Sequence, residues 1–365
     1  MRLPVWLAAV SVVLAAGASQ AQDVLRAPAP DWVRSLTSDS QASATDAAPI
    51  RILALDEQVR FDAEGVHTHI VRRIRIQTAQ GLGMVSTVSA VWSPPSQRLE
   101  VHRVRILRGD QVIDVLESQA FQTLQREDNL ESSMLDGRLT ATLQPRDLRV
   151  GDVLETAFTI HDDGGVLAPH RELLKSVSSG LTIDHYRMRA TWPATMEMQV
   201  KGPETWEGAA PRRQGDQWVF EVDRRAVLPP RMPDDLPTRY YLDKIFQFTD
   251  FTDWAAISKL MAPLYVRAET LEADSPLRAE IERIRAEHST DQARASAALR
   301  LVQDQIRYLA LSMGEGGYVP ATADDVWRSR YGDCKGKTVL LLALLHGLGI
   351  EAEAVLVSTG LNDGL

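Results

Sequence analysis

The chain has one cysteine, Cys334, in 365 residues. A single thiol cannot form a disulfide within the chain. The sequence also lacks the Cys and His spacings of zinc sites, the Gly-x-Ser-x-Gly motif of serine hydrolases and any cofactor fingerprint. Its formal net charge of −9 gives no reason to expect a nucleic-acid partner. We therefore predict no metal, no organic cofactor and no nucleic acid.

Long hydrophobic runs are scarce as well. The apolar run at 5–16 is too short to span a bilayer, and it lies between Arg2 and the small residues Ser19 and Ala21. This order is typical of a secretory signal peptide, which we assign to 1–21. We therefore expect an exported, periplasmic protein with no transmembrane segment after signal cleavage.

Export bears on the cysteine, because thiols outside the cytoplasm tend to become disulfides. An unpaired exported thiol suggests pairing with another chain or a reactive group. Asp333 is a suitable N-cap, and the apolar run 339–345 predicts a buried helix that begins near Cys334. The N–H groups and dipole of a helix N-terminus favour the nucleophilic thiolate. Lys335 adds positive charge, whereas Asp333 opposes it. The alternative is a Cys334 that acts as a small buried apolar residue.

The length of the chain implies two domains. Residues 22–49 have the composition of a linker, with some order expected around Trp32. Short alternating segments separated by turn signals predict an antiparallel β-sandwich over 50–233. The expected strands are 66–76, 99–107, 111–115, 139–143, 153–160, 183–192 and 218–222.

From 234 to 365 the pattern becomes helical, which predicts an α+β domain. Helices are expected at 253–266, 276–288, 292–309 and 323–328, with a flexible loop at 314–317. A strand is expected at 352–358, after the helix that Cys334 begins.

A cysteine nucleophile usually works with a histidine base. His346 is twelve residues after Cys334 in the same predicted helix, which places it about 18 Å along the axis. None of the eight histidines is a good partner on sequence. His67 and His69 share one strand face, but without a third ligand we interpret them as structural or solvated. Tyr308 and Tyr318 approach the Cys334 segment along the chain.

Four segments carry a family resemblance. They are Ile306-Arg-Tyr308, Gly317-Tyr-Val-Pro320, Tyr331-Gly-Asp-Cys-Lys335 and Gly349-Ile-Glu-Ala-Glu-Ala-Val-Leu-Val357. Together they resemble the transglutaminase-like superfamily, which has a papain-like fold. The whole chain resembles exported bacterial proteins in which a β-rich domain of unknown function precedes such a domain.

The resemblance implies that Cys334 is the nucleophile, with Tyr308, Asp333 and Lys335 as supporting residues. It also implies acyl transfer or hydrolysis at an amide of a protein or peptide substrate. The family's His and Asp lie on strands that would follow Leu365, so we expect a fragment whose α+β domain is incomplete at its C-terminus. The alternative is a non-catalytic cell-envelope interaction protein with a degenerate transglutaminase-like end.

Overall fold

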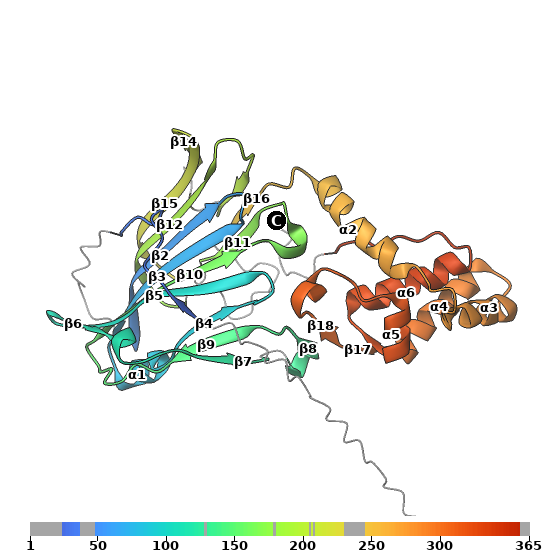
Figure 1. Cartoon of the computed structure of the whole chain (residues 1–365), viewed down its shortest axis with the longest axis horizontal. Helices are drawn as coiled ribbons and strands as arrows, with labels where there is room; N and C mark the ends of the chain where they lie inside the picture. Colours follow the sequence, from blue (N-terminus) through green and yellow to red (C-terminus); the bar gives the residue numbers. More distant parts are fainter. Residues whose placement is uncertain are drawn as a thin grey trace, which may run out of the picture.

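The computed structural model describes residues 24–36, 48–127, 130–177, 180–203, 206, 209–229 and 245–357. A β-rich part and a helical part lie side by side along the longest axis of the molecule (Figure 1). The predicted signal peptide at 1–21 lies outside the described residues. Among the helices that are described, none combines the length and apolar character that crossing a membrane requires.

A large twisted sheet forms the centre of the β-rich part. Its strand order is β1-β5-β10-β3-β2-β12-β15-β14, with β6 paired to β5. The strands are β1 (Leu25–Arg26), β2 (Ile50–Phe61), β3 (Val66–Ile76), β5 (Gln97–Arg108), β6 (Gln111–Asp114), β10 (Val153–Asp162), β12 (Ile183–Pro193), β14 (Arg212–Gln214) and β15 (Gln217–Val227). The sheet is mixed, not purely antiparallel as predicted, because β12 pairs in parallel with β2 and β1 with β5. A long excursion separates β2 from β12, which allows them to run in the same direction.

Two three-stranded sheets supply apolar side chains to the cores beside the large sheet. One has the order β4-β9-β7, and the other has the order β11-β16-β13. Their strands are β4 (Val88–Trp92), β7 (Gln122–Gln125), β9 (Leu139–Leu143), β11 (Glu172–Ser176), β13 (Gln199–Lys201) and β16 (Ile245–Thr249). Phe248 of β16 packs on Phe61 of β2, and Trp92 of β4 shares a cluster with Leu99 of β5. Because β16 pairs with β11 and β13, the β-rich part extends to Thr249, beyond the predicted boundary at 233.

Part of the predicted linker lies against the large sheet. The Gln58 side chain accepts a hydrogen bond from the Arg34 N–H at 2.9 Å and donates one to the Arg34 carbonyl at 2.7 Å. Arg187 donates to the same carbonyl at 2.6 Å and to Asp56 at 2.7 Å. Trp32 meets the ring of His69 edge-on. These contacts anchor residues 24–36 over buried polar side chains.

The helical part is built around its last helix. It contains α2 (Trp254–Glu269), α3 (Leu277–Glu287), α4 (Asp291–Gln305), α5 (Ala323–Ser329) and α6 (Cys334–Gly347). Leu340 and Leu344 of α6 are fully buried in a core shared with α3, α4 and α5. This burial confirms the prediction that the apolar helix sits inside its domain. The short helices that remain are α1 (Ala79–Val85), η1 (Val115–Glu117), η2 (Leu130–Ser132), η3 (Gly165–Leu167) and η6 (Gly314–Gly317).

Three expectations in this part were wrong. The helix predicted to reach residue 309 ends at Gln305, because β17 (Arg307–Tyr308) pairs in parallel with β19 (Tyr331–Gly332). The loop predicted at 314–317 is the 3₁₀ turn η6. Residues 352–357 of the strand predicted at 352–358 form no strand, and Val355 is 75% exposed; residue 358 lies outside the described residues. A strand needs a hydrogen-bonded neighbour, and none is described beside this segment.

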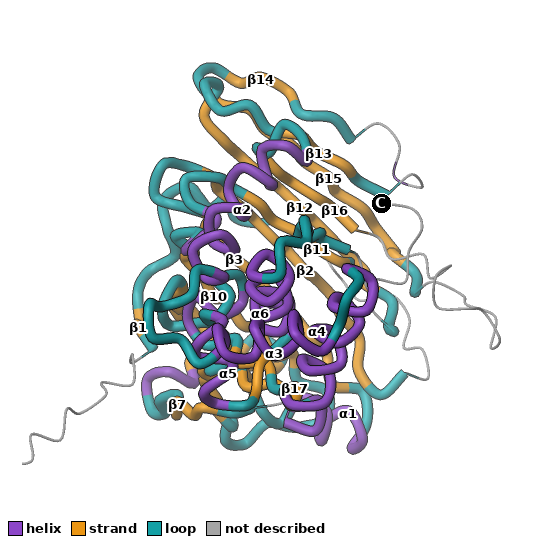
Figure 2. Tube along the Cα trace, turned by 90° about the vertical axis from the view of Figure 1, so that its right-hand side faces the viewer, coloured by secondary structure: helices purple, strands orange, loops and turns teal. Residues whose placement is uncertain are grey.

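A short parallel pairing joins the two parts. Strand β18 (Ala310–Leu311) pairs with β8 (Met134–Leu135). The Ser312 N–H donates to the Leu135 carbonyl at 2.7 Å. In Figure 2 the helices lie on the viewer's side of the large sheet, with α2 extending across it. The segment that leads from α4 to the Cys334 helix is therefore held by the β-rich part.

Candidate functional site around Cys334

Cys334 is the first residue of α6, and it is exposed. Asp333 is the N-cap, and its carboxylate accepts a hydrogen bond from the Gly336 N–H at 2.9 Å. The Thr338 hydroxyl donates to the Cys334 carbonyl at 2.7 Å within the first turn. The thiol therefore lies at the open end of a helix whose middle is buried, as the sequence predicted.

Two lysines on the first turn have different partners. Lys335 forms an ion pair with Asp333, so it partly neutralises the carboxylate next to the thiol. The Lys337 ammonium donates to the Ile306 carbonyl at 2.8 Å, where α4 ends. Lys337 thus ties the start of α6 to the segment that carries Tyr308. The Lys335–Asp333 ion pair joins the two residues that flank Cys334 in the chain.

Two tyrosines lie close enough to the thiol to share its electrostatic field. Tyr308 comes from β17, whose register places it opposite Gly332, two residues before Cys334. Tyr265 comes from α2, which packs against α6. Burial raises the pKa of Tyr265 and of Tyr308, and the negative charge of a Cys334 thiolate and of Asp333 adds to both shifts. Both phenols therefore stay protonated near neutral pH and can donate hydrogen bonds.

No sequence pattern points to Tyr265. It lies 69 residues before Cys334, in a helix that carries no motif. Only the packing of α2 on α6 brings them together, and this contact has no local signal in the sequence. By contrast, Tyr308 could be found because it lies in a segment that resembles the family pattern.

Tyr318 does not belong to this group. Burial raises its pKa, followed by the charges of Glu172 and Asp162, and both of these carboxylates belong to the β-rich part. Tyr318 therefore faces the junction between the two parts. Unlike Tyr265 and Tyr308, Tyr318 has no contribution from the charge of Cys334 to its raised pKa.

No histidine hydrogen-bonds to Cys334 in the described part of the chain. His346 lies at the far end of α6, where it pairs with Glu269 at 3.4 Å and with the Ala352 carbonyl at 3.0 Å. Asp324 accepts a hydrogen bond from the Glu272 N–H, and Asp325 pairs with Arg328 on α5. Trp327 packs in the core beneath α6. The N-cap of α5 is Thr322 and not either aspartate.

A groove of about 410 Å³ reaches the N-terminal end of α6. Leu311, Val319 and Val326 supply apolar wall, and Arg328 and Asp333 supply charge. Asp333, a lining residue of this groove, immediately precedes Cys334 in the chain. The site thus combines an exposed thiol, an electropositive helix end, two protonated phenols and an adjacent groove with an apolar wall.

Comparisons with known proteins give a family match in the β-rich part and a structural match over most of the chain. Residues 64–231 match the family described as "Domain of Unknown Function with solved-structure structure (DUF3857)". No curated protein matches the chain. Among solved structures, the chain is similar to the crystal structure of "a putative protease" from Parabacteroides distasonis, with a TM-score of 0.66 and 11% sequence identity.

The structural match covers 82% of this chain and 59% of the Parabacteroides protein. The chain thus spans about three fifths of the length of that protein. At this identity the likeness shows a shared fold, and because 82% of the chain is matched, it reaches beyond the β-rich family match.

Proposed function

We propose that this chain is an exported, transglutaminase-like thiol enzyme that acts on amide bonds of a protein or peptide. In this proposal the helical part belongs to a papain-like domain, and the β-rich part is a sandwich that precedes it. The observation that carries the proposal is the position of Cys334. It is exposed on the first turn of α6, while the apolar middle of that helix packs in the core.

The proposed reaction begins with attack of the Cys334 thiolate on an amide carbonyl carbon. The carbon–nitrogen bond breaks, the amine leaves with a proton from solvent or a general acid, and a thioester remains on the sulfur. Water or a second amine then attacks the thioester and releases the thiol. Tyr308 and Tyr265 would donate hydrogen bonds near the reacting atoms, and the groove that ends at Asp333 would hold part of the substrate.

The comparisons support this proposal in two ways. The Parabacteroides protein with the similar fold carries the name of a protease, which is an enzyme that acts on amide bonds. The family match places a domain of unknown function before the helical part, which agrees with the arrangement inferred from the sequence. Export rests on the signal-like residues 1–21 and is tested by N-terminal sequencing of the mature protein, which should begin at Gln22.

The experiment is thioester trapping on the full chain. The protein is incubated with a mixture of glutamine-containing and other peptides, quenched in acid and weighed intact by mass spectrometry. We expect an acyl adduct on Cys334 that neutral hydroxylamine removes. The Cys334→Ser variant should carry no adduct that neutral hydroxylamine removes. A wild-type chain that stays unmodified with every peptide, while remaining folded, would contradict an acyl-enzyme mechanism for this chain.

A further inference from the structure

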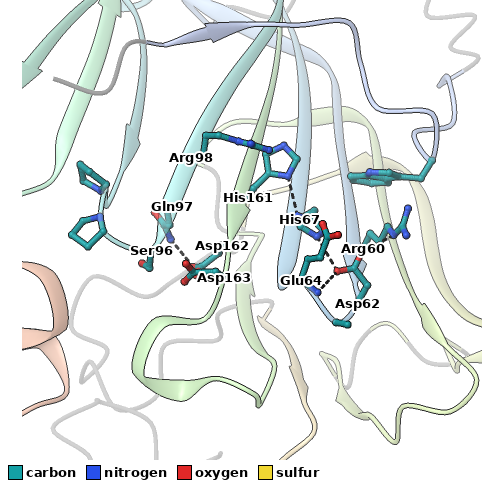
Figure 3. Close-up of a pocket in the computed structure, with 14 residues that line it drawn as sticks. Arg60, Asp62, Glu64, His67, Ser96, Gln97, Arg98, His161, Asp162 and Asp163 are labelled. Carbon is teal, nitrogen blue, oxygen red and sulfur yellow. Dashed lines mark hydrogen bonds and ion pairs between the residues drawn. The ribbon is translucent and has the colours of Figure 1, made fainter. Parts of the chain in front are cut away.

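The β-rich part contains a second candidate site that is independent of Cys334. A cavity of about 710 Å³ lies where the β2–β3 turn meets the ends of β5 and β10 (Figure 3). Trp32 and two prolines supply apolar wall, and acidic, basic and histidine side chains line the rest. Figure 3 shows His67 and His161 pointing toward each other, with Asp62 below them.

Three side chains of this cavity have the arrangement of cation ligands. One ligand atom each from Asp62, Glu64 and His67 lies within 4.8 Å of the others. His67 Nε2 is 3.1 Å from Asp62 Oδ1. Two ligands bound to one Zn²⁺ at about 2.0–2.2 Å have their donor atoms roughly 3–3.5 Å apart. Asp62 and His67 therefore already have the separation that a shared ion requires.

The turn fixes the Asp62 carboxylate. Its Oδ1 accepts from the N–H groups of Glu64 at 2.9 Å and Gly65 at 3.2 Å, and Arg60 pairs with Oδ2 at 2.9 Å. These contacts orient the carboxylate. Glu64 is exposed and able to move toward an ion.

A histidine partner of His67 lies outside the three candidate ligands. The His67 side chain is 10% exposed, and its Nδ1 is 2.9 Å from Nδ1 of His161. The Nε2 of His161 is in turn 3.1 Å from the Glu100 carboxylate. A metal-binding histidine usually donates its other ring N–H to a partner that fixes its tautomer, and a chain that ends on a carboxylate is a common form.

The donor and acceptor count of this histidine pair is compatible with a bound cation. When His67 Nδ1 donates to His161 Nδ1, the other ring nitrogen of His67, which is 3.1 Å from Asp62 Oδ1, is free to act as a ligand. A cation between that nitrogen and the Asp62 carboxylate would bind both.

We propose that Asp62, Glu64 and His67 bind a divalent metal ion of the Zn²⁺ class, with His161 and Glu100 as positioning residues. One imidazole and two carboxylates suit a borderline metal better than a hard cation such as Ca²⁺. Three protein ligands leave a coordination position toward the cavity, where water or a small ligand can bind. His69, the other histidine of this strand face, takes no part. Its Nδ1 is 2.9 Å from the Thr159 hydroxyl, and burial lowers its pKa to about 3.

The test uses Zn²⁺ alone as the probe and the full chain in a Cys334→Ser background, which removes the exposed thiol as a competing ligand. Metal-free protein is titrated with Zn²⁺ by calorimetry. We expect one saturable site per chain. Glu64→Gln should weaken it by about tenfold or more, and His161→Gln should weaken it by about 10- to 100-fold. X-ray absorption of the zinc-loaded chain should show nitrogen and oxygen neighbours with imidazole scattering.

Asp163→Asn is the matched control, because Asp163 is an exposed carboxylate of the same cavity outside the cluster. It should bind Zn²⁺ like the parent chain. The proposal is overturned if no saturable binding occurs, if Glu64→Gln binds as the parent does, or if Asp163→Asn weakens binding as much as Glu64→Gln. The last result would mean diffuse charge attraction. Because Glu64 is exposed, its variant tests the site without a risk to folding.

Discussion

Asp333 has two roles beside Cys334 that substitution can separate. Its carboxylate caps α6 through the Gly336 N–H, and its negative charge opposes formation of a thiolate on the next residue. Asn caps helices about as well as Asp but carries no charge, whereas Ala has neither the capping oxygen nor the charge. The two variants therefore test geometry and charge independently.

We predict that Asp333→Asn speeds alkylation of Cys334 at pH 7 by roughly two- to fivefold, because it removes a like charge from the thiolate. Its free energy of unfolding should change by less than about 0.5 kcal/mol. Asp333→Ala should lower the free energy of unfolding by about 1 kcal/mol through loss of the cap. Iodoacetamide kinetics and urea unfolding measure both effects. Slower alkylation in Asp333→Asn would show that the carboxylate assists the thiol.

At this scale the sequence predicted what lies near Cys334 in the chain and missed what lies near it in space. Asp333 and Lys335 follow from cap chemistry and adjacency. Tyr265 required the packing of α2 on α6, and Asp62, Glu64 and His67 required the turn after β2 to bring a carboxylate onto a histidine of β3. The alternation of a strand pairs His67 with His69 on one face, and it does not show that the preceding turn places Asp62 and Glu64 beside His67.

At the scale of elements, adjacent aspartates of α5 have opposite environments. Asp324 is 4% exposed and accepts hydrogen bonds from the Glu272 N–H at 2.9 Å and from the Ser275 hydroxyl. It thus holds the α2–α3 connection against α5. Asp325 is exposed and pairs with Arg328 at 2.6 Å on the surface.

Asp324→Ala should lower the free energy of unfolding by about 2–3 kcal/mol, because it leaves the Glu272 N–H and the buried Ser275 hydroxyl without their charged acceptor. Asp325→Ala is the control on the same helix and should cost about 0.5 kcal/mol or less, as exposed ion pairs do. Chemical denaturation of both variants measures the difference. Equal costs would mean that Asp324 does not anchor the α2–α3 connection.

Elements with a strong period were predicted well. The strand at 66–76 and the helices after residue 253 follow the pattern of their apolar residues. The end of α4 was not predicted, because the helical spacing continues through Ile306 while backbone pairing with β19 takes over at Arg307. Pairing between β17 and β19 is a tertiary contact, so local periodicity does not encode it.

At the scale of the whole molecule, the pKa values of tyrosines depend on how its parts pack. Burial comes first among the causes that raise the pKa of Tyr186, Tyr265, Tyr308 and Tyr318. A phenol with a raised pKa in the folded state holds its proton more tightly there. The stability that this contributes is fully present below the unfolded value of about 10 and is lost as pH rises through the folded values.

We therefore predict that tyrosinate absorbance rises at higher pH in the native chain than in the chain unfolded in urea. Unfolding free energy should fall as pH increases above about 10. Spectrophotometric titration of both states measures the first, and denaturation at several alkaline pH values measures the second. Coincident titration curves would contradict the raised pKa values of these four tyrosines. Tyr318→Phe should remove the part of the signal that reports on the junction.

The global arrangement was the least predictable from sequence. Composition and length indicated a β-rich part followed by a helical one, and the structure has both. The parallel pairing of β2 with β12 and the return of β16 to the β-rich part depend on contacts between distant segments. The junction through β8 and β18 involves two residues from each strand, which is too short to leave a pattern.

The central claim is that the amino end of α6 makes Cys334 a better nucleophile than an ordinary thiol, and one rate ratio tests it. Because the chain has one cysteine, the same protein unfolded in urea is its own reference. We predict that iodoacetamide alkylates Cys334 at pH 7 about tenfold faster in the native chain than in the unfolded chain, as expected for a thiol at a helix N-terminus. An exposed native thiol that reacts at the unfolded rate or more slowly would contradict the account.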